Sequence, residues 1–433
     1  MAPPQPSDFL PELEWRGLLK DATDREGLGE HLRTGPRRIY AGFDPTADSL
    51  TIGNLVPIML LAHAKRAGHE AVVLTGGGTG LIGDPSGKSA ERQLQTPERV
   101  EANVAAQRPI FENVLGQVEG RAHRIVNNAD WLTTLSYIDV LRDVGKHFSV
   151  NMMIQKDSVK SRLEDREQGI SYTEFSYMIL QAYDFLHLFR SEGISVQCGG
   201  SDQYGNIVAG ADLIRRDAFA RDAEASAFGF TAPLVTKADG GKFGKTESGA
   251  IWLTAARTSP YAYYQFWLNC SDEDVRNFLR VFTFLPREEI ESLEEEHARA
   301  PGKRAAQRRL AQEATTLLHG REEMEQAEAA GRALFSGDIA SLNEKTLNEV
   351  FSEVPSSEHD KAMLEGADLV DLLVETGLAK SKREAREFVA NGSVSINGAR
   401  AEEGRTLSSA DLLHGSTIAL RRGKKAWHVT RWA

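Results

Sequence analysis

Two stretches of the sequence combine residue types and spacing that suit phosphate binding. Thr51-Ile52-Gly53-Asn54 opens a predicted helix, and the glycine-rich run Thr75–Gly87 follows a predicted strand. A helix N-terminus carries unpaired N–H groups and a partial positive charge, and glycine lets backbone approach a phosphate closely. The two stretches therefore predict a nucleotide site. The glycine run alone leaves a plain structural turn open, because it lacks the Gly-x-Gly-x-x-Gly order and Lys88 does not complete a P-loop.

A polar stripe on an apolar segment is the second candidate for chemistry. Tyr177, Gln181 and Asp184 are spaced i, i+4 and i+7 along a predicted helix, so they share one face. The other faces of this helix are mostly apolar, which is typical of a buried helix. Buried polar groups need partners, and the pattern leaves two sources open: a hydrogen-bonded core network or a polar ligand.

Two further loops carry charged residues among glycines. Gly199–Gln203 follows a predicted strand and opens a helix, so Asp202 either caps that helix or accepts hydrogen bonds from a ribose. The loop Lys237–Gly249 holds Lys242 and Lys245 three residues apart. Such a cationic loop can close over phosphates, although an exposed loop without a ligand is the simpler interpretation of this motif alone.

The elements that position these residues form a βαβ unit followed by a second, similar half. Strand 39–43, a helix that begins near Gly53 and strand 71–74 make the first half, and strand 194–198 begins the second. This alternation predicts an α/β fold with a doubly wound, Rossmann-like parallel sheet. Ligands bind such sheets at the carboxyl ends of the strands, where the glycine runs lie.

The rest of the chain divides by pattern into further segments. We expect a catalytic domain over 1–255 with a helical insertion at about 101–192, a helical domain over 256–335, a polar linker over 336–365 and a small α+β domain over 366–433. The length of 433 residues exceeds what one hydrophobic core supports, so several domains are expected.

Composition and charge exclude several classes of protein. The chain has only two cysteines, so we expect neither a disulfide framework nor a zinc site. No apolar run approaches the roughly 20 residues of a spanning helix, and the Pro-rich first residues do not resemble a signal peptide, so we expect a cytoplasmic protein. From Gly377 onward eleven Lys and Arg face five Asp and Glu, within a chain of net charge −11. This asymmetry favours nucleic acid as a partner over a merely solvated basic face.

Five separated motifs together resemble one family. They are Gly42–Leu50, Thr79–Ser86, Arg142–Asn151, Gly199–Gln203 and Lys242–Thr246. The chain resembles bacterial-type tyrosyl-tRNA synthetases, which are class I aminoacyl-tRNA synthetases, over nearly its whole length. The resemblance implies that a homodimer activates L-tyrosine with ATP to tyrosyl-adenylate and transfers it to the 3′ end of tRNA(Tyr). It also implies Mg²⁺ bound to the ATP, no protein metal site, an anticodon-side role for the helical domain and an RNA-binding role for the last domain.

The resemblance assigns roles to individual residues. The phenol of the substrate is bound by Tyr40 and Asp184, and its ammonium and carboxylate groups are bound by Asp84, Tyr177, Gln181 and Gln203. ATP is bound by Gly42, Asp44, Gly53, Gly200, Asp202 and Lys245, and among these Asp44, Gly200 and Asp202 match the adenosine and ribose contacts of the family. The residues that contact the phosphates and act in catalysis are Thr46, Thr51, Asn54, Lys88, Arg92, Lys242, Lys245 and Thr246. The tRNA phosphates are met by Lys380, Lys382, Arg383, Arg386, Arg421, Arg422, Lys424 and Lys425.

The chain departs from the family at the class I signature, which usually reads His-Ile-Gly-His. Here it reads Thr51-Ile52-Gly53-Asn54. Losing one transition-state donor typically costs roughly 2.7–4 kcal/mol, so we expect activation to be slow but present. Two alternatives stay open. A paralogue with weakened chemistry would serve as an RNA-binding protein, which the altered signature favours. An enzyme for tryptophan is disfavoured by Tyr40 and Asp184, because indole has no hydroxyl.

Overall fold

The computed structural model describes residues 5–85, 93–156, 159–160, 163, 170–238, 240–241, 243–246, 249–352, 354–423 and 426–433. The chain forms two compact units, Met1–Thr258 with Asn269–Leu318 and Ser259–Leu268 with His319–Ala433. Among the described residues, no helix is both long enough and apolar enough to cross a bilayer.

A six-stranded sheet with the order β1-β6-β5-β2-β3-β4 forms the centre of the first unit. Five of its strands are parallel, and the short β1 pairs antiparallel with β6 at one edge. The strands are β1 (Asp21–Ala22), β2 (Arg38–Phe43), β3 (Glu70–Thr75), β4 (His123–Asn127), β5 (Val196–Gly200) and β6 (Phe228–Ala232). This order confirms the predicted doubly wound α/β fold.

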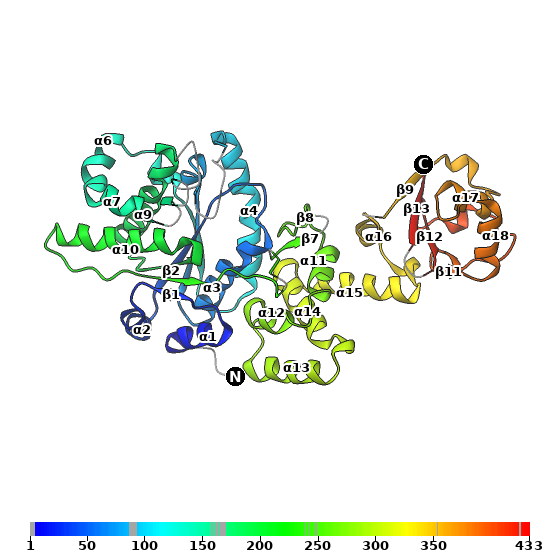
Figure 1. Ribbon diagram of the computed structural model, residues 1–433, viewed down its shortest axis with the longest axis horizontal. Coiled ribbons are helices and arrows are strands. Elements are labelled where there is room, and N and C mark those ends of the chain that lie inside the picture. Colours follow the sequence, from blue (N-terminus) through cyan, green and yellow to red (C-terminus); the bar gives the residue numbers. More distant parts are fainter. Residues whose placement is uncertain are drawn as a thin grey trace. The chain divides into compact units, whose positions relative to one another are not determined.

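Helices cover both faces of this sheet (Figure 1). The covering helices are α3 (Leu55–Arg66) and α4 (Pro97–Gln117) on one face, and α9 (Tyr172–Glu192) and α10 (Tyr204–Phe219) on the other. Successive side chains of a strand point to opposite faces. On β2, Phe43 therefore packs against Phe111 of α4, with ring centroids 4.8 Å apart, whereas Tyr40 packs against Phe185 of α9 at 5.3 Å.

The sheet opens between its two central strands. β2 and β5 pair only through Ile39 and Tyr40 of β2, so their carboxyl halves separate. Gly42 lies exposed in the separated half of β2, although both of its neighbours are buried. The order of the chain through the sheet reverses at this point, and doubly wound sheets bind ligands at such a switch point.

One sheet strand lies where we expected the helical insertion. β4 falls inside 101–192 and pairs with β3 through five residue pairs, and α4 is the crossover helix that leads to it. The expected start of the insertion is therefore wrong. All five residues of β4 are half-buried, as befits an edge strand, so the segment lacks the apolar run of a central strand. The helical segment after β4 contains α5 (Ala129–Leu132), α6 (Tyr137–Asp139), a π-helical turn (Val140–Val144) and α7 (Val150–Ile154).

The first unit contains further helices and a short hairpin. They are α1 (Phe9–Arg16), α2 (Arg25–Arg33), the hairpin β7 (Lys245–Thr246) and β8 (Gly249–Ala250), α12 (Val275–Phe282), α13 (Arg287–Arg299) and α14 (Ala305–His319). Helices α12 and α13 belong to the same compact unit as the sheet, whereas α11 (Pro260–Leu268) and α15 (Arg321–Ser336) belong to the second. The division of the chain thus differs from a single helical domain over 256–335.

The second unit holds a five-stranded sheet with the order β11-β10-β12-β13-β9. Its elements after α15 are α16 (Glu344–Val350), β9 (Ser356–His359), α17 (Leu369–Glu375), α18 (Lys382–Ala390), β10 (Val394–Ile396), β11 (Ala399–Arg400), β12 (Thr417–Arg422) and β13 (Ala426–Trp432). Their presence corrects the expected linker at 336–365, because α16 and β9 lie inside it and β9 pairs in parallel with β13.

The misread linker has a physical explanation. Leu347 and Phe351 pack with Ala419 and Val429 in one buried cluster, so the segment completes the core under the sheet. Its apolar anchors are few and widely spaced, and β9 itself is polar and half-exposed. No helical or strand period is therefore visible in the sequence, although the packing is specific.

Candidate active site

A buried phenol and a buried carboxylate form the floor of the opening between β2 and β5. The Tyr40 side chain is 1% exposed, and its hydroxyl has no hydrogen-bond partner among the described residues. Asp184 of α9 accepts hydrogen bonds from Asn128 Nδ2 at 2.9 Å and from Trp131 Nε1 at 2.7 Å. A buried hydroxyl without a partner needs one, and this hydroxyl lies near Asp184 where β2 and β5 separate, so the position suits a ligand.

Burial controls the protonation of both floor groups. Burial raises the pKa of Asp184 to about 7, the bonds from Asn128 and Trp131 lower it, and the nearby Asp44 carboxylate raises it further. Burial also raises the pKa of Tyr40 well above its ordinary value, and Asp184 and Cys198 add to this effect. Tyr40 therefore keeps its proton and remains a donor beside Asp184.

A hydrogen-bonded chain joins Asp184 to a second carboxylate, Asp44. Asn128 Nδ2 also donates to Thr79 Oγ1 at 3.0 Å, and Thr79 Oγ1 donates to Asp44 Oδ1 at 2.7 Å. The Tyr177 hydroxyl donates to Asp44 Oδ2 at 2.7 Å. Two members of the predicted polar stripe thus belong to one buried network that ends at the carboxyl edge of the sheet.

Negative charge gathers around Tyr177. Burial raises its pKa well above the ordinary value, and Asp44, Asp84 and Asp184 raise it further. A group of carboxylates around one buried hydroxyl favours a cation in the space between them. The site therefore suits an ammonium group at the level of Tyr177.

The third member of the stripe, Gln181 of α9, faces α10. Asn206 Nδ2 donates to Gln181 Oε1 at 3.0 Å and to Gln203 Oε1 at 3.3 Å. Gln203 Nε2 in turn donates to Asp84 Oδ2 at 2.7 Å and to Asp202 Oδ2 at 3.2 Å. The structure therefore brings the predicted residues of two distant motifs, 79–86 and 199–203, into one wall.

The turn before α3 faces the same edge of the sheet. The Thr51 N–H and hydroxyl both donate to Asn54 Oδ1, at 3.1 and 3.0 Å. Thr46 is exposed, and its N–H donates to the Asp44 carbonyl at 2.9 Å. An added Cβ at Gly53 would meet only Thr51 Oγ1, at 3.8 Å, so backbone here is open to a ligand.

The predicted cationic groups are only partly described. Lys88, Arg92 and Lys242 lie outside the described residues, and Lys245 and Thr246 are described only as backbone in β7. The loop nevertheless reaches the turn before α3. Gly244 has φ +76°, and a Cβ there would lie 2.2 Å from Ile52 Cγ2, so only glycine allows this approach.

The basic residues of the second unit fall into two groups. Lys380, Lys382, Arg383 and Arg386 are exposed at or beside α18, although Lys382 also pairs with Asp371 at 2.5 Å. Arg421 and Arg422 are half-buried and take part in packing, with guanidinium groups over the Trp427 and Phe388 rings. The last two predicted residues, Lys424 and Lys425, lie outside the described residues.

Sequence reasoning missed several members of the site. Asn128 and Trp131 hold Asp184, Asn206 links Gln181 to Gln203, and Leu234 is 61% exposed near Gly200. A signal for Asn128 is present in the sequence, because Arg124–Asn128 is typical of a short strand that ends in turn residues, and such an end lies at the same carboxyl edge as the other candidates. Asn206 and Leu234 carry no comparable signal.

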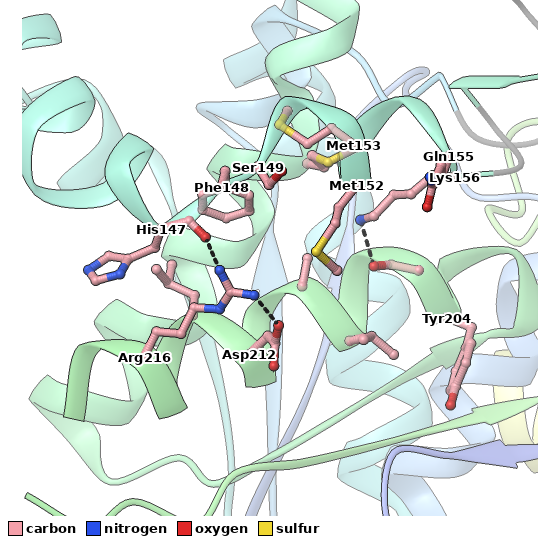
Figure 2. Close-up of a pocket in the computed structure, with 15 residues that line it drawn as sticks. His147, Phe148, Ser149, Met152, Met153, Gln155, Lys156, Tyr204, Asp212 and Arg216 are labelled. Atoms are coloured by element: carbon pink, nitrogen blue, oxygen red, sulfur yellow. Dashed lines mark hydrogen bonds and ion pairs between the residues drawn. The ribbon is translucent and has the colours of Figure 1, made fainter. Parts of the chain in front are cut away.

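A second hollow lies beside the site, between α7 and α10 (Figure 2). Its volume is about 290 Å³, and its lining includes Met152, Met178 and Arg216. Lys156 Nζ donates to the Gly205 carbonyl at 2.7 Å, and burial lowers the pKa of Lys156 to about 8, although Asp84 raises it. Within the described part of the chain, no group of three or more His, Cys, Asp or Glu side chains is arranged to hold a metal ion.

Comparisons with known proteins match both units. The family described as tRNA synthetases class I (W and Y) matches residues 32–336, and the tyrosine--tRNA ligase SYY-like C-terminal domain matches residues 346–430. The chain is 52% identical over 430 residues to a tyrosine--tRNA ligase of Bacillus caldotenax, covering 98% of this chain and 100% of that relative. It is 50% identical over 428 residues to tyrosine--tRNA ligase 1 of Bacillus subtilis, with the same coverage.

Solved structures agree with these matches. A C-terminally truncated mitochondrial tyrosyl-tRNA synthetase of Aspergillus nidulans is similar with a TM-score of 0.69 at 33% identity, covering 76% of this chain and 94% of that one. The fold and the family match together identify the chain as a class I tRNA synthetase. Within this class, the chain belongs to the tyrosine–tRNA ligase family in its bacterial form. The matches do not favour a paralogue that serves only to bind RNA.

Proposed function

We propose that this chain activates L-tyrosine with ATP to tyrosyl-adenylate and transfers the tyrosyl group to the 3′ end of tRNA(Tyr). This proposal depends on the Tyr40 hydroxyl, which lies near Asp184 and has no hydrogen-bond partner in the described part of the chain. A phenol hydroxyl accepts a hydrogen bond from Tyr40 and donates one to Asp184. Phenylalanine and tryptophan lack this hydroxyl and would leave buried groups unpaired, a rule for which tyrosyl enzymes are the standing example.

The other polar groups of tyrosine fit the two walls above this floor. We assign the ammonium group to Asp84, Tyr177 and Gln181, because carboxylates surround the Tyr177 hydroxyl. We assign the carboxylate of the tyrosine substrate to a position beside Gln203. The Gln203 Nε2 can serve a carboxylate, because it donates to Asp84 Oδ2 at 2.7 Å. Tyrosine then lies with its carboxylate toward the carboxyl edge of the sheet, where ATP would bind.

The nucleotide fits the edge beside this position. We assign the ribose and adenosine to Asp44, Gly200 and Asp202, with Gly42 and Gly53 leaving backbone open to the ligand. An added Cβ at Gly200 would lie 2.5 Å from Asp202 Oδ1, so a side chain there would displace the carboxylate proposed for the ribose.

The proposed reaction needs no nucleophilic side chain. A carboxylate oxygen of tyrosine attacks the α-phosphorus of ATP, and pyrophosphate leaves. Catalysis is then positioning and stabilisation of developing negative charge. We assign the α-phosphate to Thr46, Thr51, Asn54 and the N-terminus of α3, and the leaving pyrophosphate to Lys88, Arg92, Lys242, Lys245 and Thr246. Mg²⁺ would enter with ATP.

The second unit is proposed to bind tRNA phosphates through the exposed cations at α18. Lys380, Arg383 and Arg386 are exposed and suit phosphate contacts that carry no sequence information. Such a tRNA-dependent role is consistent with a cytoplasmic location. Truncation after Glu365 would remove β13 and leave β9 without its partner, so substitution is a sharper test of this role than deletion.

We also propose a homodimer through the helical segment after β4. Large apolar side chains that are exposed concentrate there: Tyr137, Ile138, Leu141, Val150, Met152, Ile154, Leu163 and Tyr172. Exposed apolar patches of this kind mark protein interfaces. Sedimentation equilibrium should show a dimer for the natural chain, a monomer for Ile138→Asp and an unchanged dimer for Phe219→Asp, which lies outside the patch.

Tyrosine-dependent exchange of pyrophosphate into ATP tests the proposed activation. Exchange should occur with tyrosine and stay at background with phenylalanine or tryptophan. If none of the three amino acids supports exchange above background, the proposal is wrong. The alternative of a protein that only binds RNA would then be favoured. Exchange that prefers tryptophan would show that Tyr40 and Asp184 do not select a phenol.

A further inference from the structure

An aromatic contact ties the lysine loop to a helix outside the sheet. The Phe243 ring stacks on Phe282, with centroids 5.3 Å apart and planes 13° apart, and meets Phe278 at 5.1 Å and 58°. Phe278 and Phe282 are one turn apart on α12, and both are buried. Helix α12 therefore presents a pair of rings that receives the single ring of the loop.

Other contacts hold the same loop on both sides of Phe243. The Ala238 N–H donates to Asp274 Oδ1 at 2.8 Å, directly before α12. On the other side, the Ile251 N–H donates to the Gly244 carbonyl at 2.9 Å, and the Ile52 N–H donates to the Ile251 carbonyl at 2.9 Å. The loop thus bridges α12 and the turn that opens α3.

Helix α12 is itself fixed by a buried cation from α1. Arg16 is 1% exposed and donates to the carbonyls of Arg280 at 2.9 Å, Thr283 at 2.7 Å and Leu285 at 2.8 Å. Arg280 lies in the last turn of α12, Thr283 caps the helix and Leu285 follows it, and carbonyls at a helix C-terminus lack partners within the helix. These hydrogen bonds therefore tie the end of α12 that carries Phe282 to α1.

We propose that Phe243 is a positioning residue for the reaction: its ring, seated on Phe278 and Phe282, holds the loop that carries Lys242 and Lys245 against the Thr51–Asn54 turn. The kinetic consequence of this inference rests on the proposed activation of tyrosine, whereas the anchoring of the loop does not. Lysine side chains are long and flexible, so the backbone beside them determines the region they reach. Phe243 lies between the two lysines in the sequence, and its ring holds this stretch of the loop to α12.

Amide hydrogen exchange on the full chain tests the anchoring without any reaction. Phe243→Ala should speed exchange of the Ile251 amide by about tenfold or more, because its acceptor is the carbonyl of Gly244 in the loop. The matched control is Phe219→Ala, since Phe219 is 83% exposed, and it should leave this amide unchanged. Unchanged Ile251 protection in Phe243→Ala would overturn the anchoring whatever the enzyme does.

Pyrophosphate exchange tests the kinetic consequence. Phe243→Ala should lower kcat roughly 10- to 100-fold and leave the KM for tyrosine within about twofold, because misplaced groups weaken the transition state while the tyrosine pocket is untouched. Phe243→Tyr should restore most of kcat, because it keeps the stacked ring. Natural kcat in Phe243→Ala, or a parallel loss of tyrosine binding and melting temperature, would overturn the positioning role. Absence of exchange in the natural chain would instead refute the proposed function.

Discussion

Tyr40→Phe should stabilise the free protein and weaken tyrosine binding. The substitution removes a buried hydroxyl that has no partner among the described residues. Leaving such a group unpaired costs about 1–3 kcal/mol, so its removal should raise the free energy of unfolding by about 1 kcal/mol or more. The substitution should thus raise the stability of the free protein and lower its affinity for tyrosine. A tyrosine with only a structural role would not change the affinity.

The same substitution removes one hydrogen bond to the bound phenol. A neutral hydrogen bond contributes about 0.5–1.5 kcal/mol net, which corresponds to roughly 2- to 12-fold weaker tyrosine binding. Phenylalanine should lose no affinity, because it never pairs with this hydroxyl. The ratio of the dissociation constant of phenylalanine to that of tyrosine should therefore fall by the same factor as the loss of tyrosine affinity.

Two measurements on the full chain test whether Tyr40 binds the phenol of the substrate. Isothermal titration gives the dissociation constants of tyrosine and phenylalanine, and thermal unfolding without ligand gives the melting temperature. Tyr263→Phe is the matched control, because Tyr263 is a fully buried tyrosine of the second unit and its loss should leave tyrosine affinity unchanged. A Tyr40→Phe protein that binds tyrosine as tightly as the natural chain would refute the assignment of the floor.

Three further predictions concern the signature turn, the buried carboxylate and the basic helix. Thr51→His should speed pyrophosphate exchange roughly tenfold or more by adding a phosphate donor, with tyrosine affinity unchanged; an unaltered rate would place Thr51 away from the phosphate. Asp184 has a pKa of about 7 when folded, against about 3.9 unfolded, so its contribution to stability is present below pH 4 and is lost as pH rises to 7. Asp184→Asn should flatten that part of the profile of melting temperature against pH, and an unchanged slope would contradict the burial argument. Arg383→Glu with Arg386→Glu should slow tRNA charging and reduce the salt dependence of tRNA binding, while exchange stays normal; slowed exchange would show damage beyond RNA contact.

The sequence by itself determined the fold class and the edge where the site lies. Alternating strands and helices predict a doubly wound sheet, and glycine runs after strands must lie at the carboxyl edge of that sheet. The stripe of Tyr177, Gln181 and Asp184 was visible for the same reason, because helical spacing alone places residues on one face. These inferences need only local periodicity and the direction of parallel strands.

Only the tertiary structure decided how the stripe is used and what holds the lysine loop. Asp184 is held by Asn128 and Trp131, which are 56 and 53 residues away, and no local pattern encodes such a pairing. The seat of Phe243 on α12 and the core role of Phe351 have the same origin. Both arise from contacts between segments that are distant in sequence, and such contacts depend on the path of the whole chain rather than on the spacing of neighbours.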